Sequence, residues 1–290
     1  MSRVKTYIVL ILILMTAACT DEKEKDGERI VFLHHSTGEA IWNGTPSFTS
    51  RVIRKISPTF AYRFYKQAPL PFIIKKHNRK NAKNYVIKDL QFPMKTPYGW
   101  KNYPFDYYNI WVKNGQEDFY MEEPTLNKLT RDYDMIIFKH CYPVSNIMEA
   151  TDSADINSEV KTLPNYQLQY MALKEKLHEY PDNKFLLFTA AAQVKAKITE
   201  EEAERTEEFV NWVINEWDEP DDNIFIWDLY NLQTAGDKYL KDEFAYSPTD
   251  SHPNPKFSGW AVKLLANRII DVIENNGKST SLTGELLVTR

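Results

Sequence analysis

Residues 29–38 read Arg-Ile-Val-Phe-Leu-His-His-Ser-Thr-Gly, an apolar run that ends in polar residues and a glycine. Three more short apolar runs follow, at residues 135–138 (Met-Ile-Ile-Phe), 185–188 (Phe-Leu-Leu-Phe) and 224–227 (Ile-Phe-Ile-Trp). Each run is continuously apolar instead of alternating, which is typical of parallel strands that are covered on both faces. The four runs therefore predict a parallel sheet buried between layers of helices.

Helical patterns separate the predicted strands. Residues 166–177 carry Tyr and Leu at spacings of three and four, and a capping box at 199–202 precedes an apolar stripe over residues 203–217. A last helix is predicted to begin at Pro255. Strands that alternate with helices of this length indicate an α/β protein, a three-layer α/β/α sandwich with a mostly parallel sheet. We expect this domain to span residues 29–275.

The composition is that of a folded globular protein. Of the 290 residues, 43% are hydrophobic and 26% are charged, which excludes a long disordered chain. Two cysteines are too few for a disulfide framework or a four-cysteine zinc site. We expect no cofactor. We interpret residues 276–290, which follow the predicted domain, as a C-terminal tail.

The N-terminus resembles a bacterial lipoprotein signal. Residues 1–18 combine a basic start, an apolar run of nine residues from Tyr7 to Met15, and a small-residue exit before Cys19. The run is too short for a transmembrane helix, which needs about 20 residues. Residues 19–28 form a charged tether whose acidic start resembles the surface-export signal of Bacteroidota lipoproteins. We expect a lipid on Cys19 that anchors the protein to the outer membrane, at the cell surface.

One segment departs from the mixed charge of the chain. Residues 51–101 hold thirteen Lys or Arg and one acid, Asp89, which leaves 23 basic and 39 acidic residues elsewhere. Aromatic residues and prolines are interleaved with them. We interpret this segment as an insertion after the first strand–helix unit that binds an anionic glycan, because basic side chains attract it and aromatic rings stack on sugars. The alternative is a solvated insertion that binds no ligand. We do not expect nucleic acid to be the ligand, because the protein is predicted to be exported. The binding residues that we predict are Lys75, Lys76, Arg79, Lys80 and Trp100.

Two separate motifs carry the chemistry. Ser36 directly follows the first predicted strand, and Asp250-Ser-His252-Pro precedes the last predicted helix. The carboxyl ends of parallel strands meet at one edge of a sheet, where helix N-termini stabilise negative charge. A serine hydroxyl needs a base to become a nucleophile, and the base needs an orienting carboxylate. His252 and Asp250 can supply both. A helix cap and a loop ion pair are the alternatives.

These motifs resemble the SGNH (GDSL-like) hydrolase superfamily, over the whole predicted domain. His35-Ser36-Thr37-Gly38 matches the nucleophile block, and Asp250-x-His252-Pro253 matches the block before the last helix. The resemblance implies an ester hydrolase in which Ser36 is the nucleophile, His252 the general base and Asp250 its orienting carboxylate. The Asp stands two residues before the His instead of three, a spacing found in some members that act on polysaccharides.

The resemblance also implies a block that stabilises the oxyanion. The family carries Gly-x-Asn-Asp after the third strand, whereas residues 139–146 read Lys-His-Cys-Tyr-Pro-Val-Ser-Asn, with the Asn three residues late. We expect backbone N–H groups near the nucleophile and Gly38, together with Asn146, to bind the oxyanion. Gly115 is our candidate for the glycine of a further family block, with Gly99 as the alternative.

The predicted function is removal of acyl groups, with acetyl as the expected group, from a polysaccharide or oligosaccharide at the cell surface. A glycan-binding lipoprotein without turnover is one alternative, which the irregular oxyanion block favours. The other is a metal-dependent hydrolase built from side chains at the predicted strand ends: His34 or His35, His140, Asp250 and His252. Adjacent histidines of a strand point to opposite faces, so both cannot easily bind one ion. We therefore expect no metal at this site, and we expect the histidines to line the pocket. Cys141 is interpreted as a small buried hydrophobe.

Overall fold

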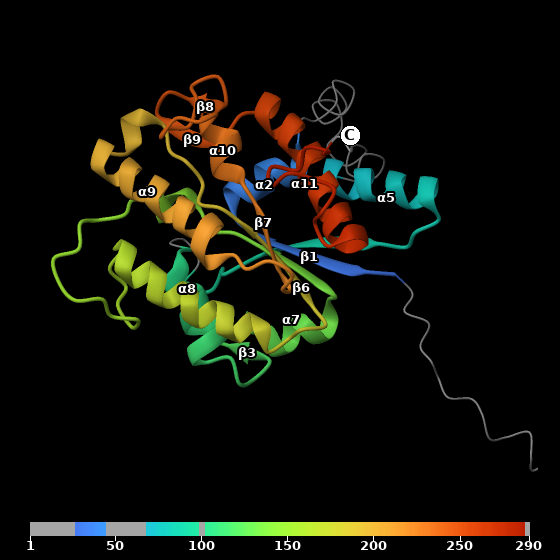
Figure 1. Cartoon of the computed structure of the whole chain (residues 1–290), viewed down its shortest axis with the longest axis horizontal. Coiled ribbons are helices and arrows are strands. Elements are labelled where there is room, and N and C mark those ends of the chain that lie inside the picture. The colour runs from blue at the N-terminus through green and yellow to red at the C-terminus, as the bar shows by residue number, and fades with distance from the viewer. Residues whose placement is uncertain (1–26, 45–67, 99–101, 288–290) are drawn as a thin grey trace, which may run out of the picture.

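The computed structural model describes residues 27–44, 68–98 and 102–287. Its centre is an all-parallel sheet of five strands in the order β2-β1-β5-β6-β7 (Figure 1). The strands are β1 (Arg29–His34), β2 (Val86–Gln91), β5 (Met135–Phe138), β6 (Lys184–Phe188) and β7 (Ile224–Trp227). Four of them are the continuously apolar runs of the sequence, so these four predicted strands are confirmed.

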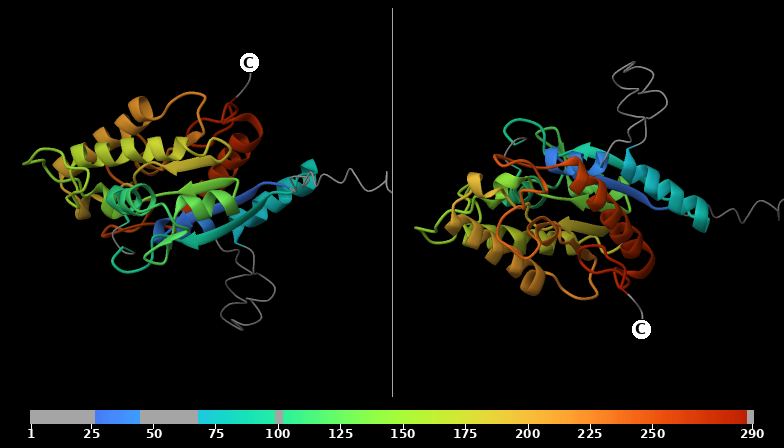
Figure 2. Two further views of the ribbon diagram at one scale, coloured as in Figure 1. Left: turned by 90° about the horizontal axis from the view of Figure 1, so that it is seen from below. Right: turned by 90° about the horizontal axis from the view of Figure 1, so that it is seen from above.

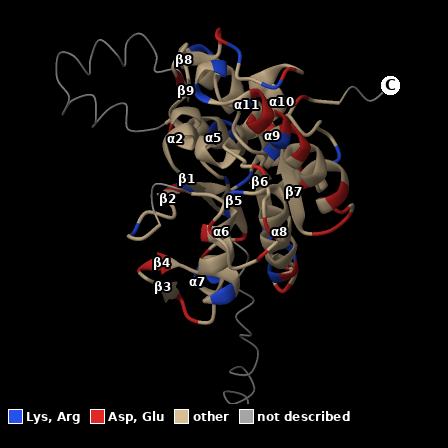
Figure 3. Ribbon diagram, turned by 90° about the vertical axis from the view of Figure 1, so that its left-hand side faces the viewer, with Lys and Arg blue, Asp and Glu red and all other residues tan. Residues whose placement is uncertain are grey.

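Helices cover both faces of the sheet. On one face lie α2 (Ser36–Asn43), α5 (Pro69–Asn81), α10 (Leu229–Thr234) and α11 (Pro255–Asn275). On the other lie α6 (Pro104–Tyr107), α7 (Leu126–Asp132), α8 (Leu163–His178) and α9 (Glu200–Trp212). Figure 3 shows the sheet between α2, α5 and α11 on one side and α6, α7 and α8 on the other, and Figure 2 shows α5 beside α11. The protein is therefore an α/β/α sandwich, as predicted.

Two hydrophobic cores follow from the alternation of side chains along the buried strands. In β1, Ile30 and Phe32 belong to the core beneath α2 and α11, whereas Val31 and Leu33 belong to the core beneath α8 and α9. All four side chains are fully buried. Since a parallel strand in the middle of such a sandwich has no solvent face, the apolar run is continuous.

Short elements complete the fold. They are the helical turns η1 (Tyr108–Lys113), η2 (Tyr142–Ser145), η3 (Lys195–Lys197) and η4 (Val213–Trp217) and the two-stranded pairs β3 (Phe119–Tyr120) with β4 (Glu123–Pro124) and β8 (Ala245–Ser247) with β9 (Asp250–Pro253). The capping box is confirmed, because the Thr199 hydroxyl accepts from the Glu202 N–H at 3.2 Å and the Glu202 carboxylate accepts from the Thr199 N–H at 3.0 Å. The last helix begins at Pro255 as predicted, with Asn254 as its N-cap.

The fifth strand comes from the basic segment. Our description of residues 51–101 as an insertion missed α5 and β2, which pairs with β1 from Arg29↔Val86 to His34↔Gln91. β2 is an edge strand in which only Ile87 is buried, so its sequence, Val-Ile-Lys-Asp-Leu-Gln, has no continuous apolar run. Charged residues on an edge strand also oppose pairing with other chains.

The end of the chain packs back onto the domain. The indole Nε1 of Trp227 donates to the Thr283 carbonyl at 2.9 Å, and the Asp228 N–H donates to the Leu282 carbonyl at 2.9 Å. Thr280 and Leu286 form an isolated antiparallel bridge. The segment that we predicted as a tail therefore belongs to the folded domain, at least over its described part.

Several predictions concern residues outside the described ranges. These include the signal peptide, the lipidated Cys19, nearly all of the charged tether, and Trp100 with Gly99 in the basic segment. Across the described ranges, no helix combines the length and the apolar composition that a membrane span requires.

Candidate active site

The topology indicates where a ligand would bind. From β1 the chain moves outward to β2 and then crosses back to β5 on the other side of β1, so the strand order reverses between β1 and β5. Doubly wound α/β proteins bind ligands at such a switch point, outside the carboxyl ends of the strands. A pocket of about 310 Å³ lies there, and residues that follow β1, β2 and β5 line it, including His35, Ser36, Gln91, Met94, Cys141 and Tyr142.

Ser36 is exposed at the edge of this pocket. It is the first residue of α2, and the first hydrogen bond of the helix runs from the Glu39 N–H to the His35 carbonyl at 2.8 Å. The N–H groups of Ser36, Thr37 and Gly38 precede that bond, so they have no acceptor within the helix. Free N–H groups at a helix N-terminus stabilise negative charge. The hydroxyl therefore lies beside donors suited to an oxyanion.

Gly38 allows α2 to pack closely against the ends of β1 and β5. A Cβ atom on Gly38 would lie 2.3 Å from the Cβ of His34 and 3.0 Å from the Cδ of Lys139. No side chain fits at the first of these distances without a shift of the backbone. The residue expected to serve the oxyanion thus also has a steric reason to be glycine.

Gly38→Ala is expected to destabilise the protein by about 1–3 kcal/mol, the usual cost of overpacking, and to lower turnover by displacing the first turn of α2. Alanine favours a helix over glycine by about 1 kcal/mol, so a net loss must come from the clash. Denaturant unfolding would measure it, with the exposed Glu39→Ala of the same helix as the control. Unchanged or higher stability in Gly38→Ala would contradict the expected contact.

Asp250 and His252 form a pair on β9, directly before α11. The Oδ1 atom of Asp250 accepts from the Nδ1 of His252 at 2.6 Å and from its backbone N–H at 3.0 Å. The backbone N–H, and after it the ring, hold the pKa of the Asp250 carboxyl below its ordinary value. A carboxylate that accepts from Nδ1–H leaves the lone pair of Nε2 free to act as a base.

Tyr142 connects this pair to the serine pocket. Its ring stands edge-on to the His252 ring at a centroid separation of 5.2 Å and also lines the Ser36 pocket. Asp250 and His252 line a second pocket of about 380 Å³, to which α2 contributes Ala40 and Asn43. The structure therefore brings Ser36, Asp250 and His252 to one edge of the sheet. The hydrogen bonds found among the described residues do not include one from Ser36 to His252.

The other two oxyanion candidates are placed differently. The Oδ1 of Asn146 accepts from the Nε2 of Gln193 at 2.9 Å, so its amide is engaged with the residues after β6. A Cβ on Gly115 would lie 2.0 Å from the Trp111 carbonyl oxygen, which gives that glycine a steric role at the end of η1. Neither residue is among the described residues that line the Ser36 pocket.

The predicted anion-binding residues of α5 lie on another part of the surface. Lys75, Lys76, Arg79 and Lys80 are all exposed. The C-terminal end of α5 leads directly into the start of β2, at the amino edge of the sheet, whereas Ser36 lies at the carboxyl edge. The structure does not bring this basic face to the pocket.

Each histidine of the metal alternative has its own partner. The Nε2 of His34 lies 3.4 Å from the Asp89 carboxylate, and the His35 ring contacts the Pro93 carbonyl. The Nε2 of His140 is 2.7 Å from the Tyr170 hydroxyl. Burial lowers the pKa of His35, and it lowers the pKa of His140 to about 3, so both rings are neutral.

A different group has metal-ligand geometry. Within the described ranges, His178, Glu219 and Asp222 are the only such set with ligand atoms close enough to share an ion. Glu219 already pairs with Lys174 at 2.6 Å, and Asp222 with His178 at 2.9 Å. This set precedes β7, so it lies at the amino edge of the sheet, away from Ser36.

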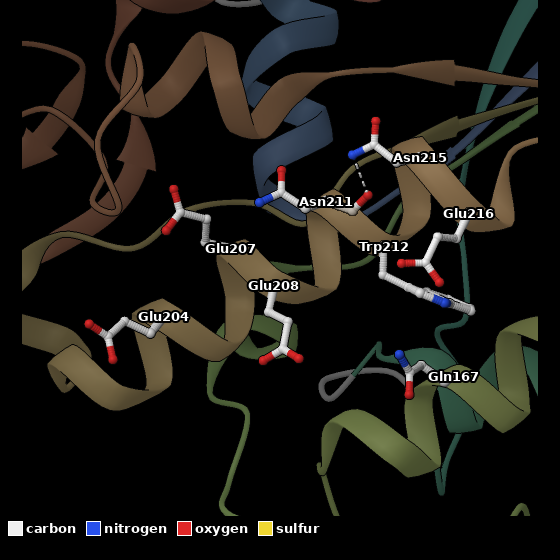
Figure 4. A pocket seen from close by; sticks show the side chains of 8 residues that line it. All are labelled: Gln167, Glu204, Glu207, Glu208, Asn211, Trp212, Asn215 and Glu216. Carbon is white, nitrogen blue, oxygen red and sulfur yellow. Dashed lines mark hydrogen bonds between the residues drawn. The ribbon is translucent and has the colours of Figure 1, made fainter.

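A larger hollow, about 430 Å³, lies between α8 and α9 (Figure 4). Half of its lining is acidic, and the rest is amide side chains and one indole: Gln167, Glu204, Glu207, Glu208, Asn211, Trp212, Asn215 and Glu216. No serine, cysteine or histidine belongs to that lining. The hollow therefore offers no hydroxyl or thiol nucleophile with a histidine base, and the smaller pocket at the switch point is the better candidate for a serine hydrolase site.

Sequence reasoning missed Gln91, Met94 and Tyr142 as residues of the pocket. Gln91 ends the unrecognised strand β2, and Met94 follows it, so recognition of that strand would have placed both at the carboxyl edge. Tyr142 follows β5 directly after Cys141, and its position after a predicted strand was the available signal.

The topology is that of a doubly wound α/β protein. At the carboxyl edge of its sheet, the pocket at the switch point has an exposed serine in its lining and an Asp–His pair beside it. No family model and no curated protein matches this chain. Its function must therefore be inferred from the residues at this edge.

Proposed function

We propose that this protein is a serine ester hydrolase of the SGNH type, which removes acyl groups, with acetyl the first candidate, from a polysaccharide or oligosaccharide at the cell surface. The observation that carries the proposal is the 2.6 Å Asp250–His252 pair at the same sheet edge as Ser36, an exposed hydroxyl at the start of α2. The resemblance of both motifs to that superfamily supports it.

The chemistry follows from these positions. The Oγ of Ser36 attacks the acyl carbonyl while the Nε2 of His252 takes the hydroxyl proton and then gives it to the leaving sugar oxygen. Asp250 holds the ring through Nδ1–H, and the free N–H groups at the start of α2 stabilise the oxyanion. Water activated by His252 releases the acyl group in the second half of the reaction. We expect the Ser36–His252 hydrogen bond to form when substrate is bound, since such bonds are often longer in empty sites.

The second candidate is a glycan-binding protein that has no turnover. The absence of Asn146 from the described lining of the Ser36 pocket favours it, because the pocket then lacks the asparagine donor that the resemblance implies. The two candidates differ in one measurable property, the release of acid from an acylated substrate.

A substrate screen tests the proposal. Purified protein and a Ser36→Ala variant would be incubated with acetylated xylan, an acetylated uronic-acid glycan and 4-nitrophenyl acetate, and acetate or nitrophenol release would be measured. We expect release from at least one substrate by the unaltered protein and none above background by the variant. Equal release by both proteins would overturn the serine mechanism, and binding without release would favour the glycan-binding candidate.

Export as a lipoprotein is part of this proposal. Cys19→Ser should remove the lipid attachment site, and we expect the variant to leave the membrane fraction while the unaltered protein stays in it. Metabolic labelling with a fatty acid, followed by fractionation, measures both properties. A Cys19→Ser variant that is still labelled and still in the membrane fraction would contradict the anchor.

We propose that the exposed cations of α5 bind an anionic glycan at a site separate from the catalytic edge of the sheet. Neutralising Lys75, Lys76, Arg79 and Lys80 to glutamine should weaken binding of a uronic-acid glycan at least tenfold at low salt, with unchanged hydrolysis of 4-nitrophenyl acetate. The affinity of the unaltered protein should fall as salt rises, because the Debye length shortens from about 30 Å at 0.01 M to about 8 Å at 0.15 M. An affinity independent of both changes would contradict an electrostatic origin.

A further inference from the structure

Two reactive side chains at the end of β5 have no part in the proposed hydrolysis. Lys139 is completely buried, and the Sγ of Cys141, 3.7 Å away, is the hydrogen-bond partner of its Nζ. Cys141 is itself only 5% exposed, yet it lines the Ser36 pocket. A buried amine is thus directed to a thiol that faces a pocket.

The surroundings of Lys139 disfavour its charged form. Across the described ranges, no carboxylate lies within ion-pair distance of its amine. Burial lowers the pKa of the Lys139 amine, as expected for a cation without a counter-charge. The N-terminus of α2, which carries a partial positive charge, packs against its stem, since Gly38 approaches the Cδ. Without a counter-charge, burial favours the neutral amine, which is the form that can accept a proton.

The other titratable groups near the pair do not compete for that role. The Tyr107 hydroxyl donates to the Lys139 carbonyl at 2.8 Å, and burial raises the pKa of Tyr107 far above its ordinary value. Burial, and after it Asp250, raise the pKa of Tyr142. Burial lowers the pKa of the His35 ring, and its Nε2 is already in contact with the Pro93 carbonyl. Lys139 is therefore the base whose contact with the thiol the structure shows.

We propose that Cys141 is a covalent modification site of the Ser36 pocket, which takes small soft electrophiles, with the Lys139 amine as the acceptor of the thiol proton. With an alkyl halide, the Sγ–H proton passes to Nζ, Sγ forms a bond to the carbon, and the halide leaves with the bonding electron pair. The thiolate is the reactive form of cysteine, so the neighbouring base sets the rate at neutral pH. The pocket of about 310 Å³ suits a small reagent, and Met94 and Pro143 give it apolar walls.

Modification would also occupy the space beside Ser36, because both residues line the same pocket. The adduct is therefore expected to block any ligand that binds at the switch point. The modification itself does not depend on the proposed hydrolase activity, so labelling can be measured whether or not an ester substrate is found.

The experiment uses the full folded chain and iodoacetamide. The protein would be incubated with the reagent at pH 7, unfolded and digested, and the carbamidomethylated fraction of the Cys141 peptide would be followed over time by mass spectrometry. We expect labelling of the folded protein at Cys141. Lys139→Met should slow it at least tenfold at pH 7 and move its rise to higher pH, whereas the exposed Lys113→Met should leave rate and pH profile unchanged.

Two results would overturn the inference: a Cys141 that is labelled only after denaturation, or equal rates with and without Lys139. Circular dichroism would show whether Lys139→Met is folded. If it is not, the pH profile of the unaltered protein decides, because labelling that rises only above the ordinary pKa of a thiol, about 8.5, contradicts a role for the amine. If an ester substrate is known, alkylation should abolish its hydrolysis in step with the labelled fraction.

Discussion

Replacement of Ser36 by alanine is expected to lower the rate of ester hydrolysis by roughly four orders of magnitude or more, and His252→Ala should have a similar effect. The double variant should be little worse than either single variant, because residues that act as one unit are not additive. The physical reason is that neither the hydroxyl nor the base performs the attack alone. Single-turnover and steady-state rates on the best substrate of the screen would measure these losses.

Variants of Asp250 and of the neighbouring Thr249 make this test more specific. Asp250→Asn should cost less than loss of the base, because it leaves His252 present but removes the acceptor of its Nδ1–H. Thr249→Ala is the matched control, since Thr249 is exposed and occupies the position where the resemblance would place the aspartate. A Ser36→Ala variant with near-normal turnover, or a Thr249→Ala variant as impaired as Asp250→Asn, would remove the triad from this protein.

The second large effect concerns stability. Asp271→Ala is expected to lower the free energy of unfolding by about 3–5 kcal/mol, because it leaves a buried cation without its partner. Asp271 and Arg268 of α11 are 3% and 4% exposed and lie 3.7 Å apart. The Oδ2 of Asp271 also accepts from the Thr280 hydroxyl at 2.7 Å and from the Thr280 N–H at 2.8 Å. The substitution should therefore also release the end of the chain from α11.

Denaturant unfolding and hydrogen exchange measure the two parts of this effect. Lys278→Ala is the control, because Lys278 and Asp221 form a solvent-exposed pair at 2.8 Å, and exposed pairs contribute little to stability. Amide exchange over residues 279–287 should accelerate in Asp271→Ala and stay unchanged in Lys278→Ala. A loss below about 1 kcal/mol would show that Arg268 is satisfied by its bonds to Ile226, Gly277 and Thr280 without Asp271.

The parts of the site that were predicted are those whose chemistry is local. Asp250 and His252 are two residues apart, so one loop is enough to pair them, and their motif could be read directly. Ser36 follows one of the continuous apolar runs that predict the strands. By contrast, Asn146 and Gly115 are predicted from the resemblance alone, at positions that depart from the family pattern, and the structure places neither in the pocket lining.

The sequence by itself determined the class of fold, because strands buried on both faces must be apolar at every position, and helices between them must carry one apolar stripe. Only the tertiary structure showed that β2 completes the sheet, since an edge strand with one buried residue has no such pattern. Only the tertiary structure brought Gln91, Cys141 and Tyr142 together around Ser36. Contacts between residues more than fifty positions apart depend on strand order, which hydrophobic periodicity does not encode.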